Sequence, residues 1–222
     1  MTTTTKNLVV LGAGTAGTMV VNKLRKRLPD SEWTITVVAK DDIHDYQPGY
    51  LFIPFGINTP KQVRRSARQF LPEGVAVVTA EVQRVDADAA VVHLVGGREL
   101  PYDQLVIATG TTPRPDQTPG TEGEEFHKSV GEFYTFDGAV ALRDQLALFK
   151  GGRLVVHITE LPIKCPVAPL EFAFLADDYF RQRGLRDKVE ITYATPLDGA
   201  FTKPVASKTL GSLLEEKGIV LE

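Results

Sequence analysis

The stretch Asn7-Leu-Val-Val-Leu-Gly-Ala-Gly-Thr-Ala-Gly-Thr-Met-Val-Val21 decides how the first part of this chain folds. An apolar run typical of a β-strand precedes the pattern Gly12-x-Gly14-x-x-Gly17, and a helix-forming stretch follows it. In this context the first glycine permits a tight turn, the second lets a pyrophosphate approach the backbone, and the third allows close packing of helix on strand. A glycine turn that serves packing alone is the alternative. The clear strand pattern at 7–12 and helix pattern at 15–28 favour a dinucleotide site over this alternative.

The second predicted strand, residues 33–39, ends in Ala39-Lys40-Asp41. Folds that bind NAD usually place an acidic residue at the end of this strand, about 20 residues after the glycines, where it binds the ribose. In this chain the acidic residue either comes later than usual, as Asp41, or is absent. The ribose contact therefore comes either from Asp41 or from backbone and small groups, and this feature does not choose between NAD and FAD.

A second motif, Ala108-Thr109-Gly110, ends a predicted buried strand at 104–109. Before it, residues 74–86 and 90–98 alternate in polarity around a turn at 86–89, which predicts an antiparallel β-meander. The two motifs together resemble those of the two-dinucleotide-domain flavoprotein reductases, in which the later turn returns to the same FAD. This resemblance favours FAD as the cofactor.

Composition is that of an ordinary α/β protein. The chain has 222 residues, 43% of them hydrophobic, and a net charge of −3, which implies no general attraction to nucleic acid or anionic lipid. Its single cysteine excludes an internal disulfide framework and suits a reducing cytosol. The N-terminus has no apolar signal core, no run reaches the length of a membrane helix, and the four histidines lack metal-ligand spacing, so no metal site is expected.

The remaining segments predict a second α/β unit. Residues 40–60 read as irregular, 60–71 and 136–150 as helices, and 111–125 as a surface linker. A βαβ unit follows, with a strand at 153–158, a helix at about 166–183 and a strand at 189–194. We expect an α/β fold with a Rossmann-like FAD-binding domain over 1–112, its β-meander excursion included. We also expect a linker and helix over 113–150, followed by a second, incomplete Rossmann-like βαβ domain over 151–222.

The turn of the second βαβ unit, residues 159–169, contains no glycine. Prolines at 162, 166 and 169 remove backbone donors where a phosphate would need them, so NAD(P)H binding is not expected there. Cys165 precedes Pro166, which is suited to the first position of a helix. The helix N-terminus and Lys164 would then stabilise the thiolate. The alternative is a buried cysteine that acts as a small apolar residue.

The chain as a whole resembles the N-terminal part of the sulfide:quinone oxidoreductase and flavocytochrome c sulfide dehydrogenase family. The stretches that carry the resemblance are 12–17, 46–56, 102–110 and 164–172. The resemblance implies that 46–56 runs beside the flavin and that Cys165 is the catalytic residue at the flavin face. The FAD-binding residues expected are Gly12, Gly14, Thr15, Ala16, Gly17, Ala39, Lys40, Gln47, Pro48, Val82, Ala108, Thr109 and Gly110.

The same resemblance implies sulfide or a small sulfur species as substrate and a quinone as electron acceptor. It also implies a cytoplasmic protein whose membrane contact, peripheral at the inner face, uses a region beyond Glu222. The family's partner cysteine near 115–135 is missing, and we expect the chain to be truncated, with weak FAD retention or none; a homo-oligomer stays open. Two alternatives remain: a type II NADH:quinone dehydrogenase-like flavoprotein, and a flavin- or sulfur-binding module without turnover.

Overall fold

The computed structural model describes residues 5–222 as two compact units. The first unit comprises the described residues up to Gln47 together with Pro60–Pro113. The second comprises Pro48–Thr59 and Arg114–Glu222. The short segment 48–59 therefore belongs, by its contacts, with the C-terminal part of the chain.

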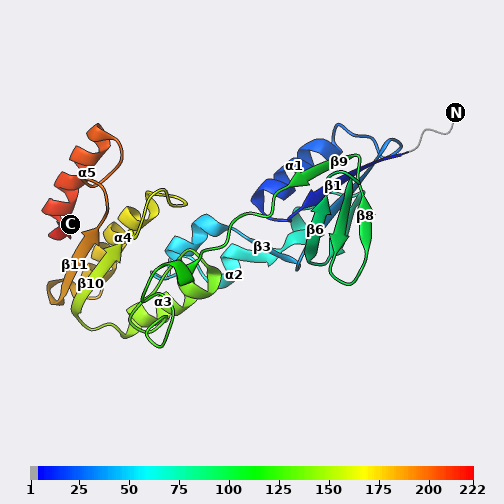
Figure 1. Cartoon of the computed structure of the whole chain (residues 1–222). Helices are drawn as coiled ribbons and strands as arrows, with labels where there is room; N and C mark the ends of the chain where they lie inside the picture. Colours follow the sequence, from blue (N-terminus) through cyan, green and yellow to red (C-terminus); the bar gives the residue numbers. More distant parts are fainter. Residues whose placement is uncertain (1–4) are drawn as a thin grey trace. The chain divides into compact units, whose positions relative to one another are not determined.

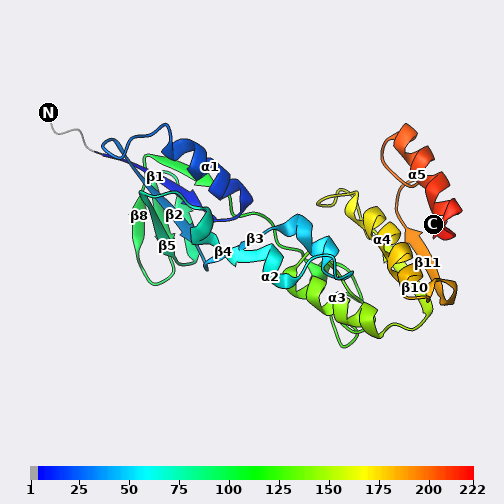
Figure 2. The same cartoon turned by 180° about the vertical axis from the view of Figure 1, so that it is seen from behind.

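The first unit is built on a four-stranded parallel sheet in the order β5-β2-β1-β9. Its elements are β1 (Lys6–Leu11), α1 (Thr15–Arg25), β2 (Trp33–Ala39), β5 (Val75–Thr79) and β9 (Gln104–Ile107). The strand at 7–12 and the helix after it are confirmed, although α1 ends at Arg25, three residues early. β1 lies between β2 and β9 and is almost wholly buried, as its apolar run predicts. Figure 1 shows α1 running alongside β1 and β9, and Figure 2 shows β2 and β5 from behind.

The predicted meander is wrong in its first strand. Residues 74–86 do not form one strand, because Val75–Thr79 joins the parallel sheet as β5 and the chain then turns at Ala80, whose N–H donates to the carbonyl of Ala39 (2.9 Å). The antiparallel sheet that follows consists of β6 (Val82–Asp86), β7 (Val91–Leu94) and β8 (Glu99–Pro101). The alternating polarity does correspond to antiparallel strands from Val82 onward, but the first half of the predicted stretch belongs to the parallel sheet.

The predicted helix at 60–71 is also wrong. Only Pro60–Val63 is helical (α2); Arg64–Ser66 (β4) pairs antiparallel with Ile43–Asp45 (β3), and a 3-10 turn at Ala67–Phe70 follows. Arg64 donates two hydrogen bonds to the carboxylate of Asp45, both 2.8 Å long. This bidentate pair and the strand pairing outweigh the local helix propensity.

The second unit contains a three-stranded parallel sheet in the order β10-β11-β12. Its elements are α3 (Phe136–Leu148), β10 (Gly152–His157), α4 (Ala168–Gln182), β11 (Val189–Ala194), α5 (Pro204–Glu216) and β12 (Ile219–Leu221). The second βαβ unit is confirmed within two residues at each boundary. α4 packs on β10 and β11 and α5 on β12, around a core that includes Phe172, Phe180 and Tyr193.

A buried carboxylate joins these elements. Asp177 of α4 is fully buried and accepts hydrogen bonds from Arg181 (2.9 Å), Arg186 (2.6 Å) and Lys217 (3.3 Å). Burial raises the pKa of this carboxyl, but the three cationic donors outweigh burial and hold the pKa below its usual value. Arg186 also donates to the carbonyl of Lys217, so the network ties α4 to the start of β12.

Among the described residues, the helices are too short or too polar to cross a membrane.

Candidate functional site

The glycine turn between β1 and α1 has the geometry that the sequence predicts. Gly12 has a φ of +105°, and a Cβ there would strike the carbonyl of Ala108. A Cβ on Gly17 would strike the carbonyl of Gly12. Both positions therefore require glycine for the fold itself, since the turn folds back against the strand end at Ala108.

Gly14 differs from the other two glycines. Its φ is −76°, and a Cβ there would meet nothing within 4 Å. Gly14 is the N-cap of α1, makes no side-chain cap, and is followed by a first turn that holds no acidic residue. The first N–H groups of a helix have no partner within it, and the loop before this helix, residues 12–14, carries no charged side chain. This arrangement fits the pyrophosphate of a dinucleotide.

His44 supports this turn, a role that no motif in the sequence predicts. Its Nδ1 lies 2.9 Å from the carbonyl oxygen of Ala13, inside the glycine motif, and its ring packs on Phe70 with centroids 4.4 Å apart. Because a carbonyl only accepts, Nδ1 carries the proton in this contact. A histidine just after the second strand has no sequence signal for such a role, because the pairing of β3 with β4 is what brings it to the turn.

The residues expected near the ribose lie at the end of β2. Ala39 is half-buried, Lys40 is exposed, and the Asp41 carboxylate accepts a hydrogen bond from the N–H of Ile43 (3.0 Å). Val82 is the first residue of β6. It is half-buried and packs against a cluster of buried apolar side chains in the first unit. Asp41 thus already has a structural partner, which favours backbone and small groups as the ribose contact.

The later motif lies directly against the glycine turn. Ala108 follows β9, and its N–H donates to the carbonyl of Leu11 (2.8 Å). Thr109 is exposed and Gly110 has a φ of +74°. Two motifs nearly one hundred residues apart in sequence therefore meet at one end of β1.

Gln47 and Pro48 lie at the start of a 3-10 turn, Gln47–Phe52, where the chain passes from the first unit to the second. Both residues are exposed.

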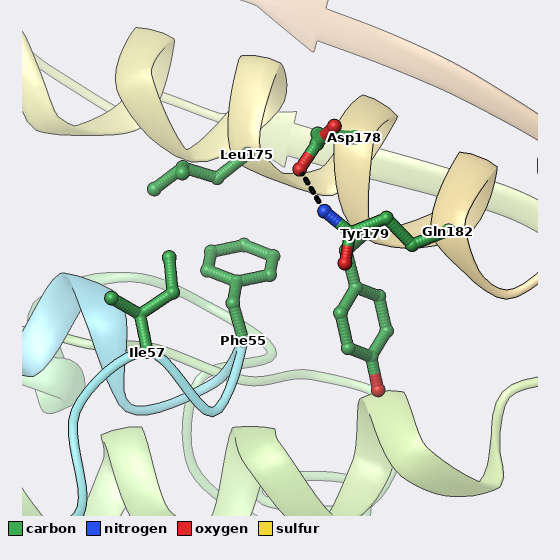
Figure 3. A pocket seen from close by; sticks show the side chains of 6 residues that line it. All are labelled: Phe55, Ile57, Leu175, Asp178, Tyr179 and Gln182. Carbon is green, nitrogen blue, oxygen red and sulfur yellow. Dashed lines mark hydrogen bonds between the residues drawn. The ribbon is translucent and has the colours of Figure 1, made fainter.

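In the second unit the segment after this turn packs on α4. Phe55 contacts Phe172 and Tyr179, with ring centroids 4.9 and 5.7 Å apart. Figure 3 shows Phe55 and Ile57 facing the helix across a shallow hollow, where Gln182 donates a hydrogen bond to Asp178 (2.6 Å). The residues that line this hollow are Phe55, Ile57, Leu175, Asp178, Tyr179 and Gln182.

The turn of the second βαβ unit is unlike the first. In the first unit only residues 12–14 separate strand and helix, whereas residues 158–167 separate β10 from α4. The helix begins at Ala168, two residues later than predicted, so Cys165 does not lie at its N-cap, which is Val167. Pro169 occupies the first turn and provides no N–H there. A compact phosphate cradle is not formed by this segment.

Cys165 is exposed, which excludes the alternative of a buried apolar cysteine. Its φ is +53°, a left-handed conformation that is rare outside glycine. Its carbonyl accepts hydrogen bonds from the N–H of Ala168 (3.0 Å) and from the hydroxyl of Tyr134 (3.2 Å). Because strained backbone conformations cluster at functional sites, the left-handed φ makes Cys165 a candidate functional residue.

Comparison with known proteins shows the family. The chain matches the pyridine nucleotide-disulphide oxidoreductase family over residues 6–156 and belongs to it. The mitochondrial sulfide:quinone oxidoreductase of Dictyostelium discoideum is 26% identical over 213 residues, covering 96% of this chain and 47% of that protein. The type II NADH:quinone oxidoreductase of Staphylococcus aureus is 34% identical over 124 residues, or 55% of this chain and 30% of that protein.

The crystal structure of the sulfide:quinone oxidoreductase from Aquifex aeolicus matches with a TM-score of 0.82 at 24% identity, covering 98% of this chain and 50% of that chain. This match shows the fold. The chain spans about half the length of these sulfide:quinone oxidoreductases. The predicted resemblance, the Rossmann-like α/β class and FAD as the cofactor of this flavoprotein family are thereby confirmed.

Proposed function

We propose that this protein is an FAD-dependent oxidoreductase that oxidises sulfide, or a related sulfur species, through Cys165 and passes the electrons to a quinone. The observation that carries the proposal is the exposed thiol of Cys165 in a turn that lacks a nucleotide cradle. The likeness in sequence to sulfide:quinone oxidoreductases across 96% of the chain supports it.

In this proposal the first unit holds the cofactor. The N–H groups at the start of α1 bind the pyrophosphate beside Gly14, Ala39 and Lys40 lie at the ribose, and Thr109 and Gly110 form the second approach to the nucleotide. Gln47, Pro48 and Val82 complete the predicted set. Bound FAD supplies an acceptor for two electrons.

In the second unit Cys165 is the nucleophile. Joining HS⁻ to its thiolate as a persulfide, Cys165–S–S⁻, releases two electrons and one proton, and bound FAD would supply the two-electron acceptor. The hydrogen bonds to its carbonyl from Tyr134 and Ala168 fix the backbone that carries it. A peripheral membrane position, which a quinone acceptor implies, is part of the proposal.

A type II NADH:quinone oxidoreductase is the second candidate, because the Staphylococcus aureus relative has that activity by name. Such an enzyme needs a pyridine nucleotide site in its second dinucleotide domain. The long turn at 158–167, with its three prolines nearby and no glycine before α4, argues against such a site here.

The electron donor decides between these functions. The protein is purified with added FAD, and anaerobic stopped-flow absorbance follows bleaching of the flavin by sulfide and by NADH. We expect fast reduction by sulfide, slow or no reduction by NADH, and loss of the sulfide reaction in Cys165→Ser with FAD still bound. Fast reduction by NADH alone would establish the second candidate. Bound flavin that neither donor reduces would indicate a binding module without turnover.

A further inference from the structure

A chain of contacts in the first unit joins α1 to the glycine turn that precedes it. The side-chain amide of Asn22, on α1, donates one hydrogen bond to the carbonyl of Thr18 in the same helix (2.8 Å). It donates a second to the carbonyl of Phe70 (2.7 Å), the last residue of the 3-10 turn that follows β4. The ring of Phe70 packs on His44, whose Nδ1 donates to the carbonyl of Ala13. The contacts therefore run from the helix, through Phe70 and His44, back to the turn before the helix.

The contact at Ala13 sets the direction of a backbone donor. In a trans peptide the carbonyl of one residue and the N–H of the next point in opposite directions. His44 holds the carbonyl of Ala13 toward its ring, so the N–H of Gly14 is directed away from that ring. The next carbonyl, that of Gly14, accepts from the N–H (3.0 Å) and the hydroxyl (2.9 Å) of Thr18. Both peptides that flank Gly14 are thus oriented in advance, which lowers the ordering cost of binding an anion.

Asn22 anchors the end of the 3-10 turn, whereas Asp42 anchors its start. The carboxylate of Asp42 accepts hydrogen bonds from the hydroxyl of Ser66 (2.6 Å) and from the N–H of Arg68 (3.1 Å). At the other end, the side chain of Phe70 is 40% exposed, so packing on one side only holds its ring. The hydrogen bond from Asn22 to the backbone of Phe70 therefore helps to set the position of that ring.

Asn22 lies too far from the start of α1 to touch a pyrophosphate bound there. It comes eight positions after Gly14, and a helix rises about 1.5 Å per residue, so the two residues are roughly 12 Å apart along the axis. An effect of this side chain on the bound cofactor must pass through other residues.

We propose that Asn22 is a positioning residue for FAD. Through Phe70 it keeps the ring of His44 in place, and His44 in turn directs the N–H of Gly14 toward the pyrophosphate. The inference rests on the proposed function only in placing the pyrophosphate beside Gly14, and it does not depend on the electron donor or on Cys165.

Titration of the whole chain with FAD tests this inference by a double-mutant cycle. Wild type, Asn22→Ala, His44→Phe and the double variant are titrated by flavin fluorescence, and the coupling is obtained from the four Kd values. Phe70→Leu removes the aromatic contact but keeps the backbone carbonyl that Asn22 binds. Met19→Ala is the matched control, because Met19 is a 54% exposed side chain of α1 that lies nearer to the turn.

We expect Asn22→Ala to raise the FAD Kd about threefold and His44→Phe to raise it about fivefold. Because both substitutions act on the same peptide, the double variant should also show a rise of only about fivefold, whereas independent effects would give about fifteenfold. Phe70→Leu should resemble Asn22→Ala, and Met19→Ala should match wild type.

The tautomer of His44 provides a readout that a merely structural residue would not change. Proton–nitrogen NMR correlation spectra, recorded where the imidazole is neutral, distinguish a proton on Nδ1 from one on Nε2. We expect wild type to carry the proton on Nδ1, as the hydrogen bond to Ala13 requires, and Asn22→Ala to show a mixture of both tautomers. Thermal midpoints show whether each variant is folded, and Phe70→Leu gives the same two measurements if Asn22→Ala is not.

An unchanged Kd or an unchanged His44 tautomer in both Asn22→Ala and Phe70→Leu would overturn the inference alone, as would a rise of about fifteenfold in the double variant. The proposed cofactor placement fails separately. If Gly14→Ala leaves the FAD Kd unchanged, the pyrophosphate does not lie at this turn, and the inference falls with that placement.

Discussion

Replacing Gly14 by alanine separates cofactor binding from folding. Its φ of −76° suits alanine, and the new Cβ meets nothing within 4 Å. The lower entropy of the unfolded chain favours alanine, while the N-cap preference favours glycine by a similar amount, so we expect a stability change within about 0.5 kcal/mol. The bound pyrophosphate, however, would meet the Cβ. Overpacking of about 1–3 kcal/mol corresponds to a roughly 5- to 150-fold rise in Kd for FAD.

Titration of the flavin fluorescence measures this Kd, and differential scanning calorimetry measures stability. Gly17→Ala is the matched comparison, because its Cβ strikes the carbonyl of Gly12 in the folded chain. We expect that variant to lose about 3 kcal/mol or more and to lose FAD as well. If Gly14→Ala binds FAD like wild type, the pyrophosphate does not approach this turn, and the assignment of α1 to the cofactor is refuted.

Four further predictions concern His44, Asp177 and Cys165. His44→Phe keeps the ring on Phe70 but loses the bond to Ala13, so the FAD Kd should rise about fivefold; an unchanged value in the same titration would remove His44 from the turn's support. Asp177→Ala leaves the mostly buried guanidinium of Arg186 without its carboxylate partner and should cost about 3–5 kcal/mol in urea unfolding. Because the folded pKa of Asp177 is lowered, its contribution to stability is complete above the unfolded pKa of about 3.9 and is lost as pH falls below it. The thermal midpoint of Asp177→Asn should therefore fall less in acid than that of wild type. Parallel curves of midpoint against pH would contradict this. Cys165→Gly relieves the left-handed backbone and should raise stability by about 1 kcal/mol in the same unfolding assay, whereas an equal or lower value would mean that the backbone at this position is not strained.

Much of the fold could be predicted because its signals are local. The apolar run of β1, the glycines after it and the strand at 33–39 each depend on neighbours in sequence, and β2 agrees with the prediction at both ends. The second βαβ unit was predicted for the same reason: a strand pattern, a helical pattern and a strand pattern follow one another.

The errors lie where long-range pairing competes with local preference. Residues 64–66 have an acceptable helical pattern, but β3 offers them a strand partner and Asp45 binds Arg64. Val75–Thr79 alternates like a meander strand, yet it pairs with β2, about forty residues away. Neither partner can be identified from a window of sequence.

The candidate site divides in the same way. The residues with candidate chemical roles can be found in the sequence. Gly12, Gly14 and Gly17 have a spacing that is typical of nucleotide turns, and Cys165 is the single cysteine. The contacts that support these residues cannot be found in the sequence. His44 reaches Ala13 only through the pairing of β3 with β4, and Tyr134 reaches Cys165 across 31 positions of chain.

The sequence by itself therefore determined the nucleotide-type turn, the family and the position of the single thiol, because the conformational freedom of glycine and the chemistry of cysteine are properties of individual residues. Tertiary structure alone decided that Cys165 is exposed and left-handed, that α4 begins after it, and that Asp177 is buried among three cationic donors. Exposure, strain and hydrogen bonding depend on which distant segments pack together, and that is set by the free energy of the whole fold.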